Sequence, residues 1–306
     1  MSMRAIECSA YGGPDVLTMR ELAIPTPKDN EVLIKIKAAG VNTADVRIRG
    51  LAVDGFMRIV MRLVLGLRKP RNAVLGTTLS GIVESVGRKV TRFKPGDQIF
   101  GTTGLGLGAY AEYICLPESG NILQKPPSSS FEQAVAILFG GLTSIYFLRK
   151  AGIESKSGQK LMIYGATGSV GTAAVQIAKH YLANVTSICG EQGVELAKSL
   201  GSDNIIVYTR QDIANLHEQF DIVFDAVGKI KKKDCLHLLA AGGKFATVGG
   251  LDIAKETVDQ MQFLSDLYEK GEFKAIIDKT YPLESIVDAH RYVDSGHKKG
   301  NVVVQV

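Results

Sequence analysis

The sequence Leu-Met-Ile-Tyr-Gly-Ala-Thr-Gly-Ser-Val-Gly, residues 161–171, decides the fold of this chain. Its first four residues form a short apolar run, which is typical of a strand buried on both faces. Three glycines follow, and apolar residues then recur with helical spacing from Ala174 to Leu182. Because a backbone without Cβ atoms lets a pyrophosphate approach the free N–H groups of a helix, this order predicts a phosphate site. We expect the helix to begin near Ser169.

The glycine pattern by itself is not specific, since Ala166 stands where the plain dinucleotide fingerprint has its first glycine. Residues 184–189 supply the second strand that the fingerprint requires after the helix. An ordinary turn between strand and helix, with glycine needed only for tight packing, is the alternative for these residues.

The composition is that of an ordinary globular protein, with 45% hydrophobic and 22% charged residues among 306. This length allows two domains. The formal net charge of +5 is spread along the chain, which favours anionic small molecules over nucleic acid as partners. The four cysteines lie far apart without a Cys-x-x-Cys pair, which indicates a reducing compartment and argues against structural zinc.

The N-terminus carries neither a signal-peptide pattern nor a transit pattern. No apolar run reaches the ~18 residues that a membrane span needs. We therefore expect a cytoplasmic protein without a membrane span.

Two patterns divide the chain. Up to residue 123 the sequence predicts short strands broken by turns, at 3–7, 17–22, 31–40, 81–86, 98–101 and 109–116. After Pro126-Pro127, helical patterns alternate with apolar strands at 161–164, 184–189, 205–208, 221–227 and 244–250, which predicts a doubly wound parallel sheet. The helical patterns cover 131–152, broken at Gly140-Gly141, then 192–200 and 255–270. The last residues, 276–278 and 302–306, again favour β-structure.

Residues 56–72 form a basic, apolar segment with arginines spaced four apart. A helix on a membrane surface has this pattern. A short amphipathic helix over a cleft, with a solvated basic face, is the interpretation that we prefer.

Six motifs carry a resemblance to a known family. They are Ala-Ala-Gly-Val-Asn at 38–42 with Asp45, Leu-Gly-Thr-Thr-Leu-Ser-Gly-Ile-Val-Glu-Ser-Val-Gly at 75–87, Phe-Lys-Pro-Gly-Asp at 93–97, Gly-Ala-Tyr-Ala-Glu-Tyr at 108–113, Gly-Ala-Thr-Gly-Ser-Val-Gly at 165–171 and Gly-His-Lys-Lys-Gly-Asn-Val-Val at 296–303. In this order they resemble the zinc-free quinone oxidoreductase branch of the medium-chain dehydrogenase/reductase superfamily, over nearly the whole chain. The glycine turn with Ala166 is the usual form of the fingerprint in that branch.

The resemblance implies an α/β protein of two domains. Residues 1–124 and 273–306 would form a GroES-like, β-rich substrate and catalytic domain, and residues 125–272 a Rossmann domain with a doubly wound parallel sheet that binds NADP(H). The cofactor would lie in the cleft.

The sequence also argues against a zinc ion. Catalytic zinc takes three protein ligands, commonly Cys and His. Where zinc-dependent relatives have their first cysteine ligand this chain has Asn42, and where they have Gly-His-Glu it has Gly76-Thr77-Thr78. The five histidines, at 180, 217, 237, 290 and 297, lack ligand spacing, and we expect them to be solvated. We assign no residue to a metal.

The resemblance implies site residues one by one. Asn42 would lie beside the nicotinamide and Asp45 near the substrate, and we take these two as the catalytic candidates. A helix cap is the alternative role for Asp45. The cofactor-binding candidates are Asn42, Thr143, Gly165, Ala166, Thr167, Gly168, Ser169, Val170, Gly171, Gly190, Tyr208, Ala226, Val227, Val248, Gly249, Gly250 and Asn301. Many relatives carry lysine in place of Asn301.

Two departures from the family pattern matter. The second strand ends Ile188-Cys189-Gly190, without the acid that binds the ribose hydroxyls of NAD, so we expect NADP(H), with NAD(H) as the alternative. Glu191, in the loop that follows, opposes a phosphate there. The stretch 250–255 is too short for the edge strand through which relatives dimerise, so a monomer and a homodimer both stay open.

The resemblance implies an NADPH-dependent oxidoreductase that transfers hydride to quinones or α,β-unsaturated carbonyl compounds, and we expect it to work without zinc, nucleic acid or a membrane span. The alternative is an NADPH-binding, redox-linked interaction protein with little turnover, which residues 56–72 would hold at a membrane surface.

Overall fold

The computed structural model describes residues 1–52, 56–250 and 252–306 of the chain. They divide into two units, unit 1 with Met1–Leu138 and Ile277–Val306, and unit 2 with Phe139–Ile276. The division falls later than the boundary expected after residue 124. The reason is helix α3 (Phe131–Ala136), which packs on the strands of unit 1.

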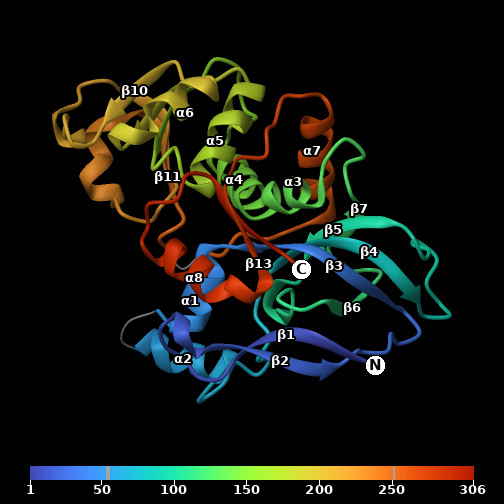
Figure 1. The fold of residues 1–306 in the computed structure, drawn as a ribbon. Helices are drawn as coiled ribbons and strands as arrows, with labels where there is room; N and C mark the ends of the chain where they lie inside the picture. The colour runs from blue at the N-terminus through green and yellow to red at the C-terminus, as the bar shows by residue number, and fades with distance from the viewer. Residues whose placement is uncertain (53–55, 251) are drawn as a thin grey trace. The chain divides into compact units, whose positions relative to one another are not determined.

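Unit 1 contains a seven-stranded sheet that both ends of the chain build (Figure 1). Strand β14 pairs antiparallel with β3, with Val302 opposite Val41. The strands follow the order β13-β14-β3-β4-β5-β7, and β6 also pairs with β3. Their bounds are β3 (Glu31–Val41), β4 (Thr78–Val86), β5 (Gln98–Thr102), β6 (Tyr113–Pro117), β7 (Ile122–Gln124), β13 (Ile277–Pro282) and β14 (Asn301–Gln305), and a separate ribbon joins β1 (Ser2–Cys8) to β2 (Leu17–Ala23).

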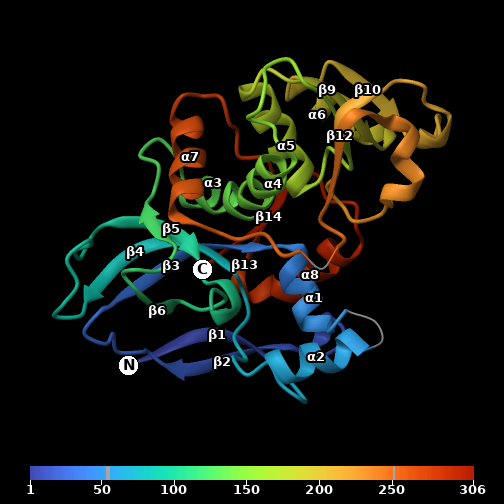
Figure 2. The same ribbon diagram turned by 180° about the vertical axis from the view of Figure 1, so that it is seen from behind.

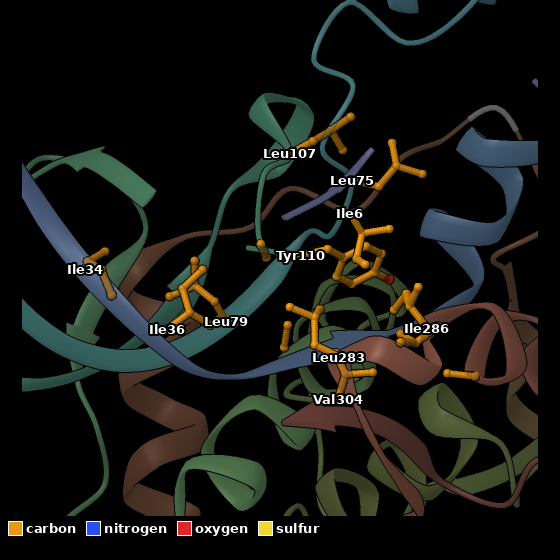
Figure 3. Packing of buried hydrophobic residues seen from close by; sticks show 14 of the residues in the cluster. Ile6, Ile34, Ile36, Leu75, Leu79, Leu107, Tyr110, Leu283, Ile286 and Val304 are labelled. Carbon is orange, nitrogen blue, oxygen red and sulfur yellow. The ribbon is translucent and has the colours of Figure 1, made fainter. Parts of the chain in front are cut away.

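The core of unit 1 lies against this sheet. Ile34 and Ile36 alternate with lysines along β3 and are buried, which is the pattern of a strand with one covered face. Figure 3 shows Ile36 beside Leu79 and Ile34 further along the same strand, and Tyr110 and Leu283 belong to the same cluster. Burial of each such aliphatic side chain contributes about 1.5–3 kcal/mol.

Three longer helices complete unit 1, namely α1 (Thr43–Gly50), α2 (Phe56–Leu65) and α8 (Ile286–Asp294). Helix α8 lies in a stretch of the sequence for which no helix is predicted. It packs on α1 through a buried polar contact, since Arg49 Nη1 lies 3.1 Å from His290 Nδ1 and Arg49 Nη2 donates to Asp294 Oδ2 at 2.8 Å. The expectation that all five histidines are solvated is wrong for His290, which has no exposed surface.

Unit 2 is built on a parallel sheet with the strand order β10-β9-β8-β11-β12 (Figure 2). The strands are β8 (Lys160–Tyr164), β9 (Asn184–Cys189), β10 (Asn204–Val207), β11 (Phe220–Asp225) and β12 (Leu239–Thr247). The helices are α4 (Leu138–Ala151), α5 (Ser169–His180), α6 (Val194–Ser199) and α7 (Val258–Glu269). From β8 the chain adds β9 and β10 on one side of β8, and it then returns to add β11 and β12 on the other side of β8. This order confirms the prediction of a doubly wound sheet.

Short 3₁₀ turns connect these elements. They are η1 (Pro14–Val16), η2 (Gly104–Gly106), η3 (Glu191–Gly193), η4 (Ile213–Asn215), η5 (Lys232–Leu238) and η6 (Leu283–Ser285). Described residues 252–257 hold no strand between β12 and α7, in line with the short stretch noted in the sequence.

The helix predicted over 131–152 does break, but not at Gly140-Gly141. The break lies at Ile137, and both glycines are inside α4. Close packing requires glycine at both positions. A Cβ at Gly140 would lie 2.2 Å from the Ser169 carbonyl oxygen, and a Cβ at Gly141 would lie 2.6 Å from the Leu264 side chain. The sequence shows a helix-breaking residue type, whereas only the neighbouring chain reveals a close approach.

Several predicted bounds shift. The strand expected over 109–116 begins at Tyr113, and the one expected over 244–250 ends at Thr247. The helix expected from residue 255 begins at Val258, because Thr257 caps it and exchanges side-chain and backbone hydrogen bonds with Gln260.

One stretch within the described residues is long and apolar enough to cross a membrane, Phe131–Ala151, with a mean hydropathy of 1.4. The sequence reading that no such run exists was therefore too strict. Of its most apolar window 67% is buried inside the fold, which is typical of a core helix.

The buried histidine predicts a pH dependence of stability. Burial, together with the Arg49 charge, lowers the pKa of His290 to about 3, whereas an unfolded histidine titrates near 6.5. The folded state therefore keeps His290 neutral, and its contribution is present above pH 6.5 and is lost as the pH falls toward 3. Relative to wild type, the free energy of unfolding of His290→Asn should rise by about 2 kcal/mol between pH 7 and pH 4.5, measured by urea unfolding.

Val293→Ala is the control, because it removes buried apolar surface from the same helix and leaves the titrating group in place. Its offset from wild type should not change with pH. An equal pH response in both variants would contradict the assignment.

Candidate nucleotide site and active site

The three glycines between β8 and α5 have different physical reasons. Gly165 has a φ of +79°, and a Cβ there would lie 2.5 Å from Val227 Cγ1. A Cβ at Gly171 would lie 2.1 Å from the Gly165 carbonyl oxygen. Both positions exclude a side chain because of the fold itself, as the packing alternative proposed.

Gly168 is different. Its φ of −78° and ψ of 178° suit any residue, and a Cβ there would meet only the Gly165 carbonyl oxygen, at 3.8 Å. The fold therefore leaves open space above this residue without needing glycine. Gly168 is the N-cap of α5, and as a glycine it has no side chain to cap that helix end. Open space at the positive end of a twelve-residue helix is where a pyrophosphate would fit.

Helix α4 braces this turn from behind. Ser144 Oγ donates to the Val170 carbonyl oxygen at 2.7 Å, and Gly140 allows the backbone approach to Ser169 already described. Thr143 is half-buried on the same segment of α4. Ala166 is fully buried beneath the turn, so its contribution to a cofactor would come through its backbone.

A second group of candidates lies where β9 and β10 end. The hydroxyl oxygen of Tyr208 lies 3.1 Å from where a Cβ of Gly190 would be, and the Tyr208 N–H donates to the Cys189 carbonyl oxygen at 3.1 Å. Arg210, which the sequence analysis passed over, forms an exposed ion pair with Glu191. The sequence does show an arginine two residues beyond Tyr208. The direction of its side chain, however, depends on the turn after β10, which the sequence does not reveal.

The third group follows β11 and β12, and a buried carboxylate organises it. Asp225 accepts from the backbone N–H groups of Val227 and Gly228 at 3.2 and 2.9 Å, and from Thr247 Oγ1 at 2.9 Å. It accepts from Ile230 as well. The two loops then meet backbone to backbone, since a Cβ at Gly228 would lie 2.8 Å from the Gly249 Cα atom.

The strand order makes these groups neighbours in unit 2. Strands β8 and β11 are adjacent at the point where the order reverses, and the carboxyl ends of parallel strands meet at one edge of the sheet. Ala226, Val227 and Val248 to Gly250 therefore share that edge with the glycine turn.

The catalytic candidates form a separate network in unit 1. Asn42 is the N-cap of α1, and its Oδ1 accepts from the N–H groups of Ala44 and Asp45 at 2.8 and 3.2 Å. Its Nδ2 donates to Thr77 Oγ1 at 2.8 Å. The Asn42 side chain is thus fixed at both ends and is 4% exposed.

Asp45 completes this cap, because its Oδ2 accepts from the Asn42 backbone N–H at 3.0 Å. Its side chain has no exposed surface, and burial raises its pKa to about 7 against the lowering effect of Asn42, Tyr110 and Thr77. The geometry gives Asp45 the helix-cap role that was its alternative. Through this hydrogen bond it positions Asn42.

Asn301 is the first residue of β14, opposite Ile277, and is half-buried in unit 1. Among the described residues no group of three or more His, Cys, Asp or Glu side chains could hold a metal ion. Burial raises the pKa of the Cys8, Cys115 and Cys235 thiols to about 11, so these cysteines are poor nucleophiles at neutral pH.

The contrast between the glycines predicts a separation of effects. Gly168→Val should leave the free energy of unfolding within about 1 kcal/mol of wild type, because a side chain fits there without strain. It should weaken NADPH binding at least tenfold, since the valine fills the space for the pyrophosphate. Gly171→Val, as the matched control, should destabilise the protein severely.

Fluorescence titration with NADPH and thermal unfolding measure the two effects. An unchanged NADPH affinity in a folded Gly168→Val protein would exclude the turn as the pyrophosphate site.

The chain is similar to known proteins over nearly its whole length. Residues 28–127 match the family model of the alcohol dehydrogenase GroES-like domain, and residues 169–271 and 252–304 match models described as zinc-binding dehydrogenase. The chain is 30% identical to the quinone oxidoreductase of Lama guanicoe, over 97% of this chain and 95% of that protein. It is also 30% identical to the 2-methylene-furan-3-one reductase of Solanum lycopersicum, over 99% and 79%.

Solved structures of related proteins also match the whole chain. The quinone oxidoreductase from Coxiella burnetii superposes with a TM-score of 0.84 at 26% identity, and all of both chains is covered. The predicted combination of a GroES-like domain with a Rossmann domain is thereby confirmed. Its sequence motifs, its two folds and its full-length relatives together show that this chain belongs to the medium-chain dehydrogenase/reductase superfamily, beside the quinone oxidoreductases and alkenal/one reductases.

Proposed function

We propose that this protein is an NADPH-dependent reductase that transfers hydride to quinones or to α,β-unsaturated carbonyl compounds without zinc. The observation that carries the proposal is the open space above Gly168, at an uncapped helix end beside the reversal point of the sheet. The names of relatives support the substrate class. One is the NADPH-dependent alkenal/one oxidoreductase of Arabidopsis thaliana, 29% identical over 99% of this chain and 79% of that protein.

When bound, the reduced nicotinamide supplies a hydride, and the reduced product takes up a proton. The residues of the chain bind and orient the reactants. The backbone from Thr167 to Gly171 holds the pyrophosphate, and Thr143 lies on the helix that braces this turn. Asn42 presents its one remaining amide hydrogen, and Asp45 keeps that amide in place. Asp45 is therefore a positioning residue.

The preference for NADPH rests on a polar group beyond β9 and β10. Glu191 opposes a phosphate, but the paired Arg210 neutralises it. An incoming 2′-phosphate offers Arg210 a second anion, and Tyr208 can donate a hydrogen bond beside Gly190. The neutral hydroxyls of NADH offer no such charge.

Independence from zinc rests on side-chain chemistry. Asn42 and Thr77 stand where zinc-dependent relatives have ligands, and they hydrogen-bond to each other. An amide and a hydroxyl are poor substitutes for thiolate and imidazole. The carboxyl group of Asp45 is used by the helix cap, where it accepts from the Asn42 backbone N–H.

The proposal is tested by NADPH consumption with and without a simple ortho-quinone or an enone, followed at 340 nm. Consumption that requires the acceptor supports a reductase. Tight NADPH binding without consumption on either acceptor class favours the alternative, an interaction protein with little turnover.

The second testable expectation concerns metal. The purified protein should contain no stoichiometric zinc, and its acceptor-dependent turnover should persist after dialysis against a chelator. Elemental analysis checks the first part. One zinc per chain, with activity lost on removal and restored on addition, would contradict zinc independence.

A further expectation concerns cofactor choice. Arg210→Ala should raise the Kd of NADPH about tenfold and leave that of NADH nearly unchanged, because a hydrogen bond to a charged group contributes about 1.5–3 kcal/mol. Glu191→Gln is the matched control, and it should tighten NADPH binding by releasing Arg210. If Glu191→Gln instead weakens NADH binding and leaves NADPH unaffected, Glu191 is the ribose ligand and NAD(H) is the cofactor.

A further inference from the structure

Helix α2 is apolar on two opposite faces. Leu65 is buried in the core of unit 1, and Met61 packs against the same cluster. On the outward side, Ile59, Leu63 and Val64 are 58%, 60% and 51% exposed. A surface helix normally turns polar residues outward, and a helix that is apolar all round is normally covered. The apolar side chains on the outward face of α2 are therefore exposed, although side chains of this kind are normally buried against another surface.

The residues after α2 extend this face and surround it with positive charge. Leu67 is 67% exposed, and Arg62, Arg68 and Lys69 are exposed beside it. We call these three cations together with Ile59, Leu63, Val64 and Leu67 the α2 patch. Residues 55–83 contain no acidic residue. Within the described part of the chain none of the three cations forms an ion pair.

The patch is held in its shape by hydrogen bonds at the end of the helix. Arg71 Nη2 donates to the Leu63 carbonyl oxygen at 2.9 Å, and the Arg71 backbone N–H donates to that of Leu65 at 2.6 Å. Tyr11 Oη donates to the Gly66 carbonyl oxygen at 2.8 Å. Figure 1 and Figure 2 show α2 beside α1, at one end of the β1–β2 ribbon. These hydrogen bonds fix the position of the outward apolar face within unit 1.

We propose that the α2 patch binds the surface of an anionic lipid bilayer. In this arrangement α2 lies along the membrane plane, with Ile59, Leu63 and Val64 among the acyl chains and the cations at the level of the lipid phosphates. This goes beyond the proposed reduction, because it assigns a place where the protein works and does not depend on which acceptor it reduces.

Charge complementarity favours lipid over a second copy of the chain. A two-fold contact through this patch would bring the cations Arg62, Arg68 and Lys69 of both copies into one interface, and like charges there repel. The apolar part is also only four side chains wide, whereas a stable dimer buries about 1,200–2,000 Å². An anionic surface satisfies both the apolar face and its cationic border.

The experiment uses the full chain and sedimentation with vesicles of phosphatidylcholine alone or with one third phosphatidylglycerol. Wild type should partition onto the anionic vesicles and not onto the neutral ones, and raising the salt concentration should weaken this binding. Leu63→Glu should reduce the partition coefficient at least about tenfold, because it removes apolar contact and adds a repelled charge. Arg62→Glu should also reduce it.

Leu182→Glu is the matched control. Leu182 is 69% exposed in unit 2, outside the α2 patch, so the same substitution should leave vesicle binding unchanged. All three variants should keep the thermal stability and NADPH affinity of wild type. NADPH affinity reports on the proposed function separately, so its loss would not be confused with loss of membrane binding.

Absence of binding to anionic vesicles overturns the proposal. Equal binding by wild type and Leu63→Glu overturns it as well, since adsorption would then come from overall charge. A dimer in analytical ultracentrifugation that Leu63→Glu dissociates, without vesicle binding by wild type, would assign the patch to a second copy.

Discussion

The close approach of α5 to the end of β8 is the constraint on which unit 2 depends. A Cβ at Gly171 would lie 2.1 Å from the Gly165 carbonyl oxygen, so the helix can begin against the strand only if residue 171 has no side chain. Gly140 brings α4 against the same turn. These contacts aim the positive end of α5 at the space above Gly168. Packing therefore explains Gly165 and Gly171, whereas the binding role proposed for Gly168 stays a prediction.

Unit 1 is organised around buried polar groups with opposite pH dependence. Asp45 keeps its proton in the folded state up to about pH 7, so its contribution to stability is lost as the pH rises from about 4 to 7. His290 stays neutral down to about pH 3, and its contribution is lost as the pH falls below 6.5. Tyr110 contacts the His290 ring edge-on, at 5.6 Å between centroids, and its hydroxyl adjoins Asp45. Between pH 4 and 6.5 the contributions of these two groups to the free energy of unfolding oppose each other.

The same unit carries the proposed catalytic residue and the exposed apolar helix on different elements. Asn42 is fixed by the cap of α1, whereas α2 turns Leu63 and its neighbours outward. Fixing Asn42 through hydrogen bonds to backbone leaves it little freedom to rearrange, which suits a residue that orients a reactant. The apolar acceptors proposed for this protein, quinones above all, concentrate in lipid, so a membrane-facing α2 and a reductase site are compatible roles for one chain.

The sequence by itself determined that the chain has two kinds of domain, and it located the strands of the parallel sheet and the helices between them. It also determined the glycine turn and the start of α5 at Ser169. It could do so because strand alternation, helical spacing and glycine are local patterns. The tertiary structure decided what no local pattern contains. Gly140 and Gly141 look like a helix break until Ser169 and Leu264 are seen beside them. His290 looks like a solvated residue until α8 is packed against Arg49. Arg210 points to Glu191, and Asp45 is a cap and not an exposed acid, because burial and partners depend on residues far away in the chain.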